Sequence, residues 1–452
     1  MIEKNKNYEC EITDLTVNGD GVTHIDGYPL FVKGVLPGDK LKIKPSKLNK
    51  AYGFAQVAKL LSPSNKRRNS ICKSFPKCGG CSLLHYDYEG QLEFKSDFVK
   101  SNIQRIGGYK EDEFKYEKII GAESEYYYRN KAQFPIRKDG NKTVCGFYEA
   151  RSHKVIDCEK CHIQHPVINS AVSLVMNFIR ENKITAYNEE GHIGIVRHIY
   201  TRYSEENKNL MVVIVTNSEK PLKNINSLVD ALKPLGLKSL VQNVNIKKTN
   251  VILGDENITL WGNDHILMQA DDLIFKASPH SFFQVNTQQM KKLYGKALEY
   301  ADLKGNETVF DLYCGVGSIS LFMAKKAKKV IGVEIVPPAI ENAKENAILS
   351  GIENTEFYCG DCTEVVQDLV KKGEAADVIV VDPPRKGCDE KLLELIKNIS
   401  PKKLVYVSCN SATLARDLAV LKEFGYVLKK ACAVDLFPQT THVESVALMS
   451  RK

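Results

Sequence analysis

From about residue 275 onward, short apolar runs alternate with stretches of helical periodicity. The runs are TVFDLYC, KKVIGVEI, TEFYCGD, DVIVVDPP and KLVYVSCN. Apolar strands that alternate with helices indicate a parallel sheet covered by helices on both faces. The final stretch, VLKKACAVDLFPQTTHVESVALMSR, predicts two more strands joined by a loop. We therefore predict an α/β domain with a Rossmann-like sheet over residues 275–452.

The first sixty residues show a different pattern. The runs YECEITDLTV, YPLFVKGV, DKLKIKPSKL and YGFAQVAKLL are separated by turn signals such as Asn18-Gly19 and Pro37-Gly38. Short strands between Gly-rich turns predict a small five-stranded β-barrel of the OB type over residues 1–60. Barrels of this kind often bind oligonucleotides.

Residues 61–274 are expected to form a mixed α+β central domain. Residues 61–87 are a loop-rich connector with three cysteines, and residues 88–107 have helical periodicity that ends at a Gly-Gly pair. A second helix is expected near residues 169–182, and LMVVIVT and SLVQNVN are typical of strands. We assign no chemistry to most of this region.

The length and charge of the chain add to this picture. A chain of 452 residues is too long for one hydrophobic core, so two or three domains are expected. The net charge is +8, and residues 40–86 contain no acidic residue but many lysines and arginines. Such a one-signed field attracts phosphate backbones. A solvated lysine-rich surface is the alternative, and we favour nucleic-acid binding.

The N-terminus and the cysteine content bear on the compartment. MIEKNKNYEC lacks the apolar run of a signal peptide, and no apolar stretch approaches the roughly 18 residues of a membrane span. We expect a cytoplasmic protein with no membrane association and no obligate protein partner. The 13 cysteines are therefore not expected to form structural disulfides. Metal binding, catalysis and burial remain as their roles.

Polar or Gly-rich residues end five successive predicted strands. In parallel α/β sheets, ligands bind beyond these carboxyl ends. Glu334 follows Gly317 by 17 residues and can accept hydrogen bonds from both hydroxyls of a ribose. Ser320 replaces the third glycine of a dinucleotide fingerprint, so S-adenosylmethionine is an alternative ligand, with Asp361 holding its adenine amino group. The residues at the five strand ends are Tyr313 to Gly317, Glu334, Asp361, Asp382 and Cys409.

Here the sequence resembles a known family. Asp-Leu-Tyr-Cys-Gly-Val-Gly, Val-Asp-Pro-Pro-Arg-Lys-Gly and Val-Ser-Cys-Asn are similar to the motifs of the RNA uracil-5-methyltransferases, as is the upstream Ser-Phe-Phe-Gln-Val-Asn. The resemblance covers nearly the whole chain. It implies a class I methyltransferase domain with S-adenosylmethionine as cofactor. The residues that it implies in binding the cofactor or the target base are Gln284, Tyr313, Gly315, Ser318, Glu334, Asp361 and Asp382.

The chemistry of this family explains the thiol and the acid near the C-terminus. Carbon 5 of uracil becomes nucleophilic only when a thiolate adds to carbon 6, and a base must later remove the carbon 5 proton. The resemblance implies Cys409 as the nucleophile and Glu444 as the base, with His442 as a competitor for the second role. Asp382 is expected to hydrogen-bond the uracil edge. An amine methyltransferase is the alternative, but it leaves Cys409 unexplained.

Cys409 is expected at the junction between a strand and a helix. The helix, SATLARDLAVLKEFG, begins directly after it, so its N-terminus predicts a thiol pKa below about 8.5. The family usually has a proline where this chain has Ser411. A serine is acceptable in the first turn of a helix.

A second group of cysteines has the spacing of a metal site. Cys72, Cys78 and Cys81 are followed far downstream by Cys158 and Cys161. The spacing allows a zinc site of two Cys-x2-Cys pairs or an iron–sulfur cluster with one of the later cysteines. The resemblance implies a [4Fe-4S] cluster held by Cys72, Cys78, Cys81 and Cys161.

The substrate is inferred from the same resemblance. The barrel resembles a TRAM domain, and a TRAM domain together with a cluster is typical of the ribosomal RNA members. We therefore expect 23S ribosomal RNA as the substrate, with transfer RNA as the alternative. An RNA-binding protein with a vestigial methyltransferase fold is a further alternative, which an intact thiol and base argue against.

Overall fold

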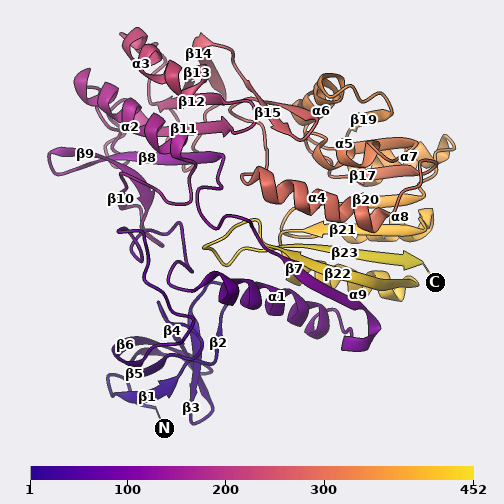
Figure 1. Ribbon diagram of the computed structural model, residues 1–452, viewed down its shortest axis with the longest axis horizontal. Coiled ribbons are helices and arrows are strands. Elements are labelled where there is room, and N and C mark those ends of the chain that lie inside the picture. The colour runs from indigo at the N-terminus through magenta and orange to yellow at the C-terminus, as the bar shows by residue number, and fades with distance from the viewer. Residues whose placement is uncertain (1, 452) are drawn as a thin grey trace.

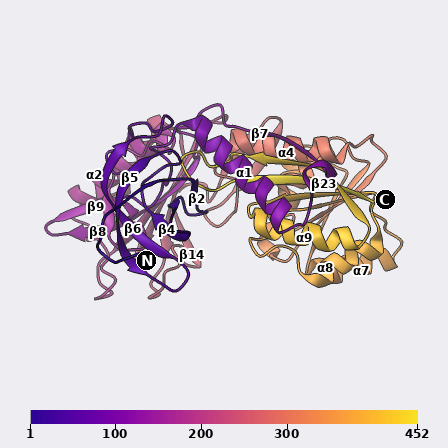
Figure 2. The ribbon, with the colours of Figure 1, turned by 90° about the horizontal axis from the view of Figure 1, so that it is seen from below.

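The computed structural model describes residues 2–451. Figure 1 shows an N-terminal β domain and a central domain stacked at one side, and a larger C-terminal α/β domain at the other. Figure 2 shows helix α1 (Tyr88–Arg105) running from the N-terminal β domain along the C-terminal domain. In the described part of the chain, no helix is long and apolar enough to cross a membrane.

The C-terminal domain is built on one mixed sheet. Its strand order is β19-β18-β17-β20-β21-β23-β22-β7, and among the described strands of this sheet only β23 runs against its neighbours. Leu312 of β17 is paired with Val333 of β18 and Val381 of β20, so these strands end at one edge of the sheet. The strands are β17 (Thr308–Leu312), β18 (Lys329–Glu334), β19 (Thr355–Cys359), β20 (Val378–Val381), β21 (Lys403–Ser408), β22 (Tyr426–Val434) and β23 (Glu444–Arg451).

Helices cover both faces of this sheet, as the apolar strand pattern predicts. Val405 and Val407 of β21 belong to one core, whereas Leu404 and Tyr406 belong to the other. Because successive side chains of a strand point to opposite faces, a strand buried on both faces has no polar side. The first core contains α4 (Thr287–Ala301), α5 (Ser318–Ala324) and α6 (Pro337–Leu349), and the second contains α1, α7 (Cys362–Lys371), α8 (Glu390–Ile399) and α9 (Ser411–Glu423).

Two elements of the C-terminal domain come from the N-terminal half of the chain. Strand β7 (Lys115–Ile120) pairs in parallel with β22, and α1 packs Val99 and Ile103 into the second core. Both lie within residues 61–274, the range expected for the central domain. The sequence pattern does not show this, because their partners lie about 300 residues further along the chain.

The N-terminal domain is a sheet of order β1-β5-β6-β4-β3-β2. Among the described residues it has six strands rather than the predicted five, because the two-residue strand Asp14–Leu15 pairs separately with β3. A small core that includes Ile12, Leu30 and Ile43 holds it together. The strands are β1 (Tyr8–Glu11), β2 (Asp14–Leu15), β3 (Gly21–Ile25), β4 (Tyr28–Val32), β5 (Lys40–Leu48) and β6 (Gly53–Ser62).

Part of the basic stretch is used inside the protein. Arg67 pairs with the fully buried Asp39, and Arg68 pairs with Glu125, with 2.6 Å between Nη2 and Oε2. Arg67 joins the connector to the N-terminal domain, and Arg68 joins it to the segment after α1 and β7. They therefore add less to an external positive field than the sequence suggests.

The central domain has the sheet order β10-β9-β8-β11-β12-β13-β14. The expected helix appears as α2 (Pro166–Glu181), and the two expected strands appear as β12 (Asn209–Thr216) and β13 (Leu237–Val244). Each residue of β11 (Val196–Ser204) is buried, since helices cover one face and the hairpin β15–β16 the other. The other elements are η1 (Glu111–Glu113), β8 (Lys131–Asp139), β9 (Lys142–Tyr148), β10 (Val155–Asp157), α3 (Ile225–Leu232), η2 (Lys233–Leu235), β14 (Glu256–Gly262), β15 (Ile266–Ala270) and β16 (Leu273–Ala277).

Candidate active site

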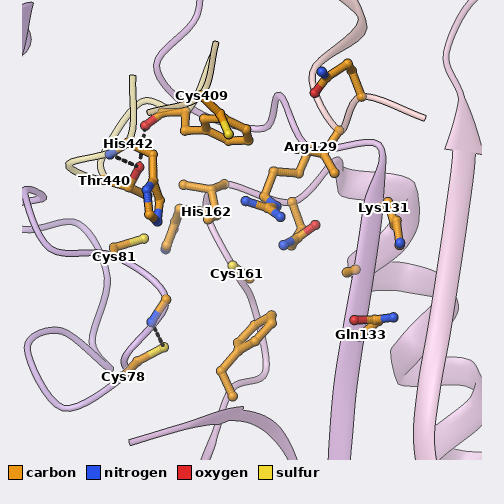
Figure 3. Close-up of a pocket in the computed structure, with 18 of the residues that line it drawn as sticks. Cys78, Cys81, Arg129, Lys131, Gln133, Cys161, His162, Cys409, Thr440 and His442 are labelled. Carbon is orange, nitrogen blue, oxygen red and sulfur yellow. Dashed lines mark hydrogen bonds between the residues drawn. The ribbon is translucent and has the colours of Figure 1, made fainter. Parts of the chain in front are cut away.

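A cavity of about 760 Å³ lies between the C-terminal sheet, the central domain and the cysteine-bearing connector. Figure 3 shows Cys409 and His442 at one end of it and Lys131 and Gln133 of β8 at the other. It brings together residues from segments that are distant in sequence. The predicted site residues that line it are Gln284, Asp382, Cys409, Glu444, Cys72, Cys78, Cys81 and Cys161.

Cys409 lies in the short turn between β21 and α9. Asn410 caps the helix, because its Oδ1 accepts a hydrogen bond from the Ala412 N–H at 3.1 Å. The Asn410 side chain also donates to the carbonyl of Arg385 at 2.9 Å. Ser411 occupies the first helical position, and its hydroxyl accepts a hydrogen bond from Asn102 at 2.8 Å. The turn is therefore held by side-chain contacts in place of the proline usual in the family.

The expected lowering of the Cys409 pKa is wrong. Burial raises the pKa of this thiol, and the nearby carboxyls of Glu444 and Asp382 raise it further. The Arg385 guanidinium and a backbone hydrogen bond act in the other direction. The partial positive charge of a helix N-terminus is worth about 0.3–1 kcal/mol at an exposed position. Here it is outweighed by burial and two acids.

Glu444 is the first residue of β23 and only 4% exposed. Burial raises its pKa to about 8, and Asp382 adds to the effect. Burial also raises the pKa of Asp382 to about 7. A general base works best when its pKa lies near the operating pH, so the environment of Glu444 suits that role. The pKa of His442 is lowered by burial first and then by Arg385, so its ring is mostly neutral.

The remaining cofactor candidates lie along the adjoining strand ends. The Glu334 carboxylate accepts hydrogen bonds from Gly315 N at 3.2 Å and from Val336 N at 3.0 Å. A Cβ at Gly315 would meet open space, so a ligand can approach this backbone closely. These contacts fit a nucleoside site next to Glu334, with the carboxylate already oriented.

Three more predicted residues stand at the same edge. Asp361 caps α7, and its Oδ1 accepts from Thr363 N at 2.9 Å. Ser318 begins α5, and Tyr313 follows β17 with a φ of 67°. The sequence does not predict that Asp361 caps α7. The cap uses only its Oδ1, so the other carboxylate oxygen is left for a ligand. None of these residues, nor Gly315 or Glu334, lines the large cavity.

The sequence motifs did not identify several residues that line the cavity. Arg129, Lys131 and His162 come from the central domain, for which no chemistry was assigned. Burial, then the charges of Arg202 and Arg129, lower the pKa of Lys131 to about 8. No spacing signal identifies these residues, because they reach the cavity only through the packing of the central sheet against the C-terminal domain.

The cysteines of the connector meet Cys161 at this cavity. Burial and then the charges of Cys161 and Cys78 raise the pKa of Cys81, and all three residues line the same cavity. Cys78 Sγ accepts a hydrogen bond from Gly80 N at 3.4 Å, drawn in Figure 3. Within residues 2–451, however, no three His, Cys, Asp or Glu side chains are grouped closely enough to hold a metal ion. The positions of these cysteines therefore do not show the expected [4Fe-4S] cluster.

The sheet order and the Gly-rich loop after β17 define a class I, S-adenosylmethionine-dependent methyltransferase fold. The predicted fold class is thus confirmed. The chain belongs to the tRNA (uracil-5-)-methyltransferase family, whose profile matches residues 87–452. The profile of the TRAM domain matches residues 3–58. The protein is thus an RNA methyltransferase with an N-terminal TRAM domain, as the sequence motifs indicate.

Curated relatives and a solved structure agree with this assignment. An uncharacterized RNA methyltransferase of Halalkalibacterium halodurans is 46% identical over 100% of this chain and 98% of its own length. One from Clostridium tetani is 44% identical over 99% of this chain and 97% of its own length. The tRNA (uracil-54, C5)-methyltransferase of Pyrococcus abyssi, solved with S-adenosyl-L-homocysteine, has a TM-score of 0.79 and 29% identity. That comparison covers 98% of this chain and 100% of the archaeal one.

Proposed function

We propose that this protein methylates carbon 5 of a uridine in 23S ribosomal RNA through a covalent bond between Cys409 and carbon 6. The observation that carries the proposal is that one cavity is lined by Cys409, Asp382 and the buried Glu444. A thiol, a hydrogen-bonding acid and a base with a pKa near neutrality are the groups that this chemistry needs. We also propose that the protein acts in the cytoplasm, where its RNA substrates are.

The proposed steps follow from these groups. Cys409 first loses its thiol proton to solvent, a step that its raised pKa disfavours. The thiolate then forms a bond to carbon 6, and the ring becomes an enolate whose carbon 5 is nucleophilic. When bound, S-adenosylmethionine would supply an electrophilic methyl group to carbon 5, with S-adenosyl-L-homocysteine as the leaving group. Glu444 in its ionised form then removes the carbon 5 proton, and the electron pair expels the Cys409 thiolate. Asp382 is proposed to hold the uracil edge, and it can donate while it keeps its own proton.

Two RNA classes compete as the substrate. Through the family resemblance, the TRAM domain together with the proposed cluster of the connector cysteines supports ribosomal RNA. The Pyrococcus abyssi enzyme supports transfer RNA, because it acts on uracil-54 of tRNA and aligns with 98% of this chain, the N-terminal domain included. The presence of that domain therefore does not decide between them.

The test is tritium release from RNA that carries tritium at carbon 5 of uracil. The protein and S-adenosylmethionine are mixed with 23S ribosomal RNA in one reaction and with bulk transfer RNA in another. We expect release from ribosomal RNA, loss of release in Cys409→Ala, and no loss in the control Cys10→Ala, whose cysteine lies on β1 far from the cavity. Tritium release only from transfer RNA would refute the assignment of 23S ribosomal RNA as the substrate. Methyl incorporation without tritium release would refute the proposed mechanism at carbon 5.

We further propose that Cys72, Cys78, Cys81 and Cys161 hold a [4Fe-4S] cluster, with zinc as the alternative. Their thiols line one cavity, and thiolates are the usual ligands of both. A single zinc ion has its sulfurs at about 2.3 Å. Within residues 2–451 no group of three such side chains is close enough to hold a metal ion, so metal analysis has to decide between the two.

Metal analysis of anaerobically purified protein tests this assignment. We expect about four iron atoms per chain, as a [4Fe-4S] cluster requires, with loss of iron in Cys161→Ser and retention in Cys158→Ser. Stoichiometric zinc without iron would refute the assignment of a [4Fe-4S] cluster to these cysteines. Since no step of uracil methylation needs electrons, the cluster is proposed to shape the site.

A further inference from the structure

The loop between β22 and β23, residues 435–443, leads directly into Glu444, and we call it the base loop. Its start is held by a buried ion pair in which Lys95 Nζ lies 2.6 Å from Asp435 Oδ1, with both side chains 0% exposed. Lys95 also donates to the carbonyl of Phe437 at 3.0 Å, and the Tyr88 hydroxyl donates to Asp435 at 2.9 Å. Helix α1 therefore fixes the first residues of the base loop.

Gln439 is the residue of the base loop with the most contacts, and it has no exposed surface. Its N–H donates to Gln91 Oε1 at 2.9 Å, and its Oε1 accepts from Gln91 and from Arg68, each at 3.1 Å. Its Nε2 donates to Glu125 Oε2 at 2.7 Å. Its φ of 71° is in the left-handed region, which a residue other than glycine keeps only where the surroundings over-determine it.

The carbonyl of Gln439 connects the base loop to the cysteine segment, which we define as residues 72–83. The N–H groups of Ser82 and Leu83 both donate to this carbonyl at 3.0 Å. Ser82 directly follows Cys81, which lines the cavity. The cysteine segment and the base loop, more than 350 residues apart in sequence, are thus fastened to one another at a single peptide group.

From Gln439 a series of short contacts leads toward Glu444. The Thr440 hydroxyl donates to the carbonyl of Phe437 at 2.8 Å and accepts from His442 N at 3.2 Å. Figure 3 shows the hydrogen bond between Thr440 and His442, and these two residues line the same cavity as Cys409. Gln439 does not itself line the cavity, so it touches no reacting atom.

We propose that Gln439 is a positioning residue that transmits the placement of the cysteine segment to Glu444. Loss of its contacts slows removal of the carbon 5 proton and leaves the addition of Cys409 and the methyl transfer intact. This inference rests on the roles proposed above for Cys409 and Glu444. It predicts that the methylated RNA remains covalently bound to the protein when Gln439 is altered.

The test uses Gln439→Met, which keeps the size of the side chain and removes its amide. Three quantities are measured with the RNA that the wild type accepts: methyl transfer in a single turnover, tritium release, and RNA bound to protein on a denaturing gel. We expect release to slow on the order of tenfold to hundredfold, because misplacement of a reacting group by about 1 Å has such an effect. Methyl transfer stays within about twofold of wild type, and the bound complex accumulates.

The matched control is Gln367→Met on the exposed face of α7, which should behave as wild type in all three assays. A merely structural role for Gln439 lowers methyl transfer and release in parallel, without accumulation of the complex, and that result would overturn the proposal. If neither Gln439→Met nor Glu444→Gln accumulates the covalent RNA complex, the result refutes the roles proposed for Cys409 and Glu444 and not the role of Gln439.

A second pair of variants tests the connection to the cysteine segment. Ser82→Pro removes one N–H that binds the Gln439 carbonyl, whereas Ser82→Ala keeps it. We expect the bound complex to accumulate in Ser82→Pro and not in Ser82→Ala, and Ser82→Pro to add nothing in a Gln439→Met background. Equal behaviour of the two Ser82 variants, or additive effects in the double variant, would show that Gln439 does not transmit the position of the segment.

Discussion

Replacement of Glu444 by glutamine is expected to stabilise the protein at alkaline pH and to have little effect at acidic pH. Burial raises the pKa of this carboxyl from 4.5 to about 8, so the folded state holds its proton more tightly than the unfolded chain. The stability that the protonated form contributes is complete below pH 4.5. This stability is lost as the pH rises from 4.5 to about 8, and above about pH 8 none of it remains. Glutamine cannot ionise and does not show this loss.

The size of the effect follows from the same values. At about 1.36 kcal/mol for each pH unit, a change from 4.5 to about 8 corresponds to at most about 5 kcal/mol. Part of it comes from the charge of Asp382, and Glu444 lines a cavity, so protein does not enclose it on every side. We therefore expect Glu444→Gln to gain about 2–3 kcal/mol over wild type at pH 9, and less than about 1 kcal/mol at pH 5.

Calorimetric unfolding of wild type and variant between pH 5 and pH 9 measures this difference. Glu423→Gln is the control, because Glu423 is exposed at the end of α9 and does not line the cavity. A stability gain in Glu444→Gln that is the same at pH 6 and pH 9, or a loss at pH 9, would refute the reasoning. It would mean that Glu444 is already ionised in the folded protein at neutral pH.

Three further outcomes follow from the structure. The rate of tritium release should rise with pH through about 8, because Glu444 acts as a base only when ionised, and a rate that is constant from pH 6.5 upward would contradict this. Lys95→Met should cost about 3–5 kcal/mol in urea unfolding, because it leaves Asp435 buried without its partner, and addition of Asp435→Asn should restore part of the loss. Gly317→Ala should weaken S-adenosylmethionine binding in calorimetry by about tenfold, because a Cβ there would lie 3.1 Å from Ala343 Cβ at a φ of 80°. Gly373→Ala, where φ is also positive but nothing lies near, should bind the cofactor as wild type does.

The sequence predicts the C-terminal sheet well. Its strands are buried on both faces, so they appear in the sequence as unbroken apolar runs. It does not predict that β7 completes this sheet, since KYEKII is a short and half-exposed strand whose partner lies far downstream. The six strands of the N-terminal domain were expected as five, because Asp14–Leu15 is too short to show a periodicity. Pattern therefore identifies elements, and long-range pairing has to come from the structure.

The candidate site divides in a similar way. Glu334 and Asp382 could be placed from the sequence because parallel strands end at one edge of the sheet. The raised pKa of Cys409 could not, because it depends on Glu444 packing beside it from another strand. Lys131 also reaches the cavity only through the packing of whole domains.

The position of β7 at the edge of the catalytic sheet has a consequence for how the protein is made. During synthesis β7 and α1 leave the ribosome about 300 residues before β22, the strand that pairs with β7. Until the last strands emerge, the apolar face of α1 has no sheet to cover, and this surface is open to aggregation or chaperone binding. A C-terminal fragment that begins at residue 275 would in turn leave the edge of β22 unpaired. A fragment cut at residue 275 would therefore lack the strand and the helix that complete the catalytic sheet and its second core.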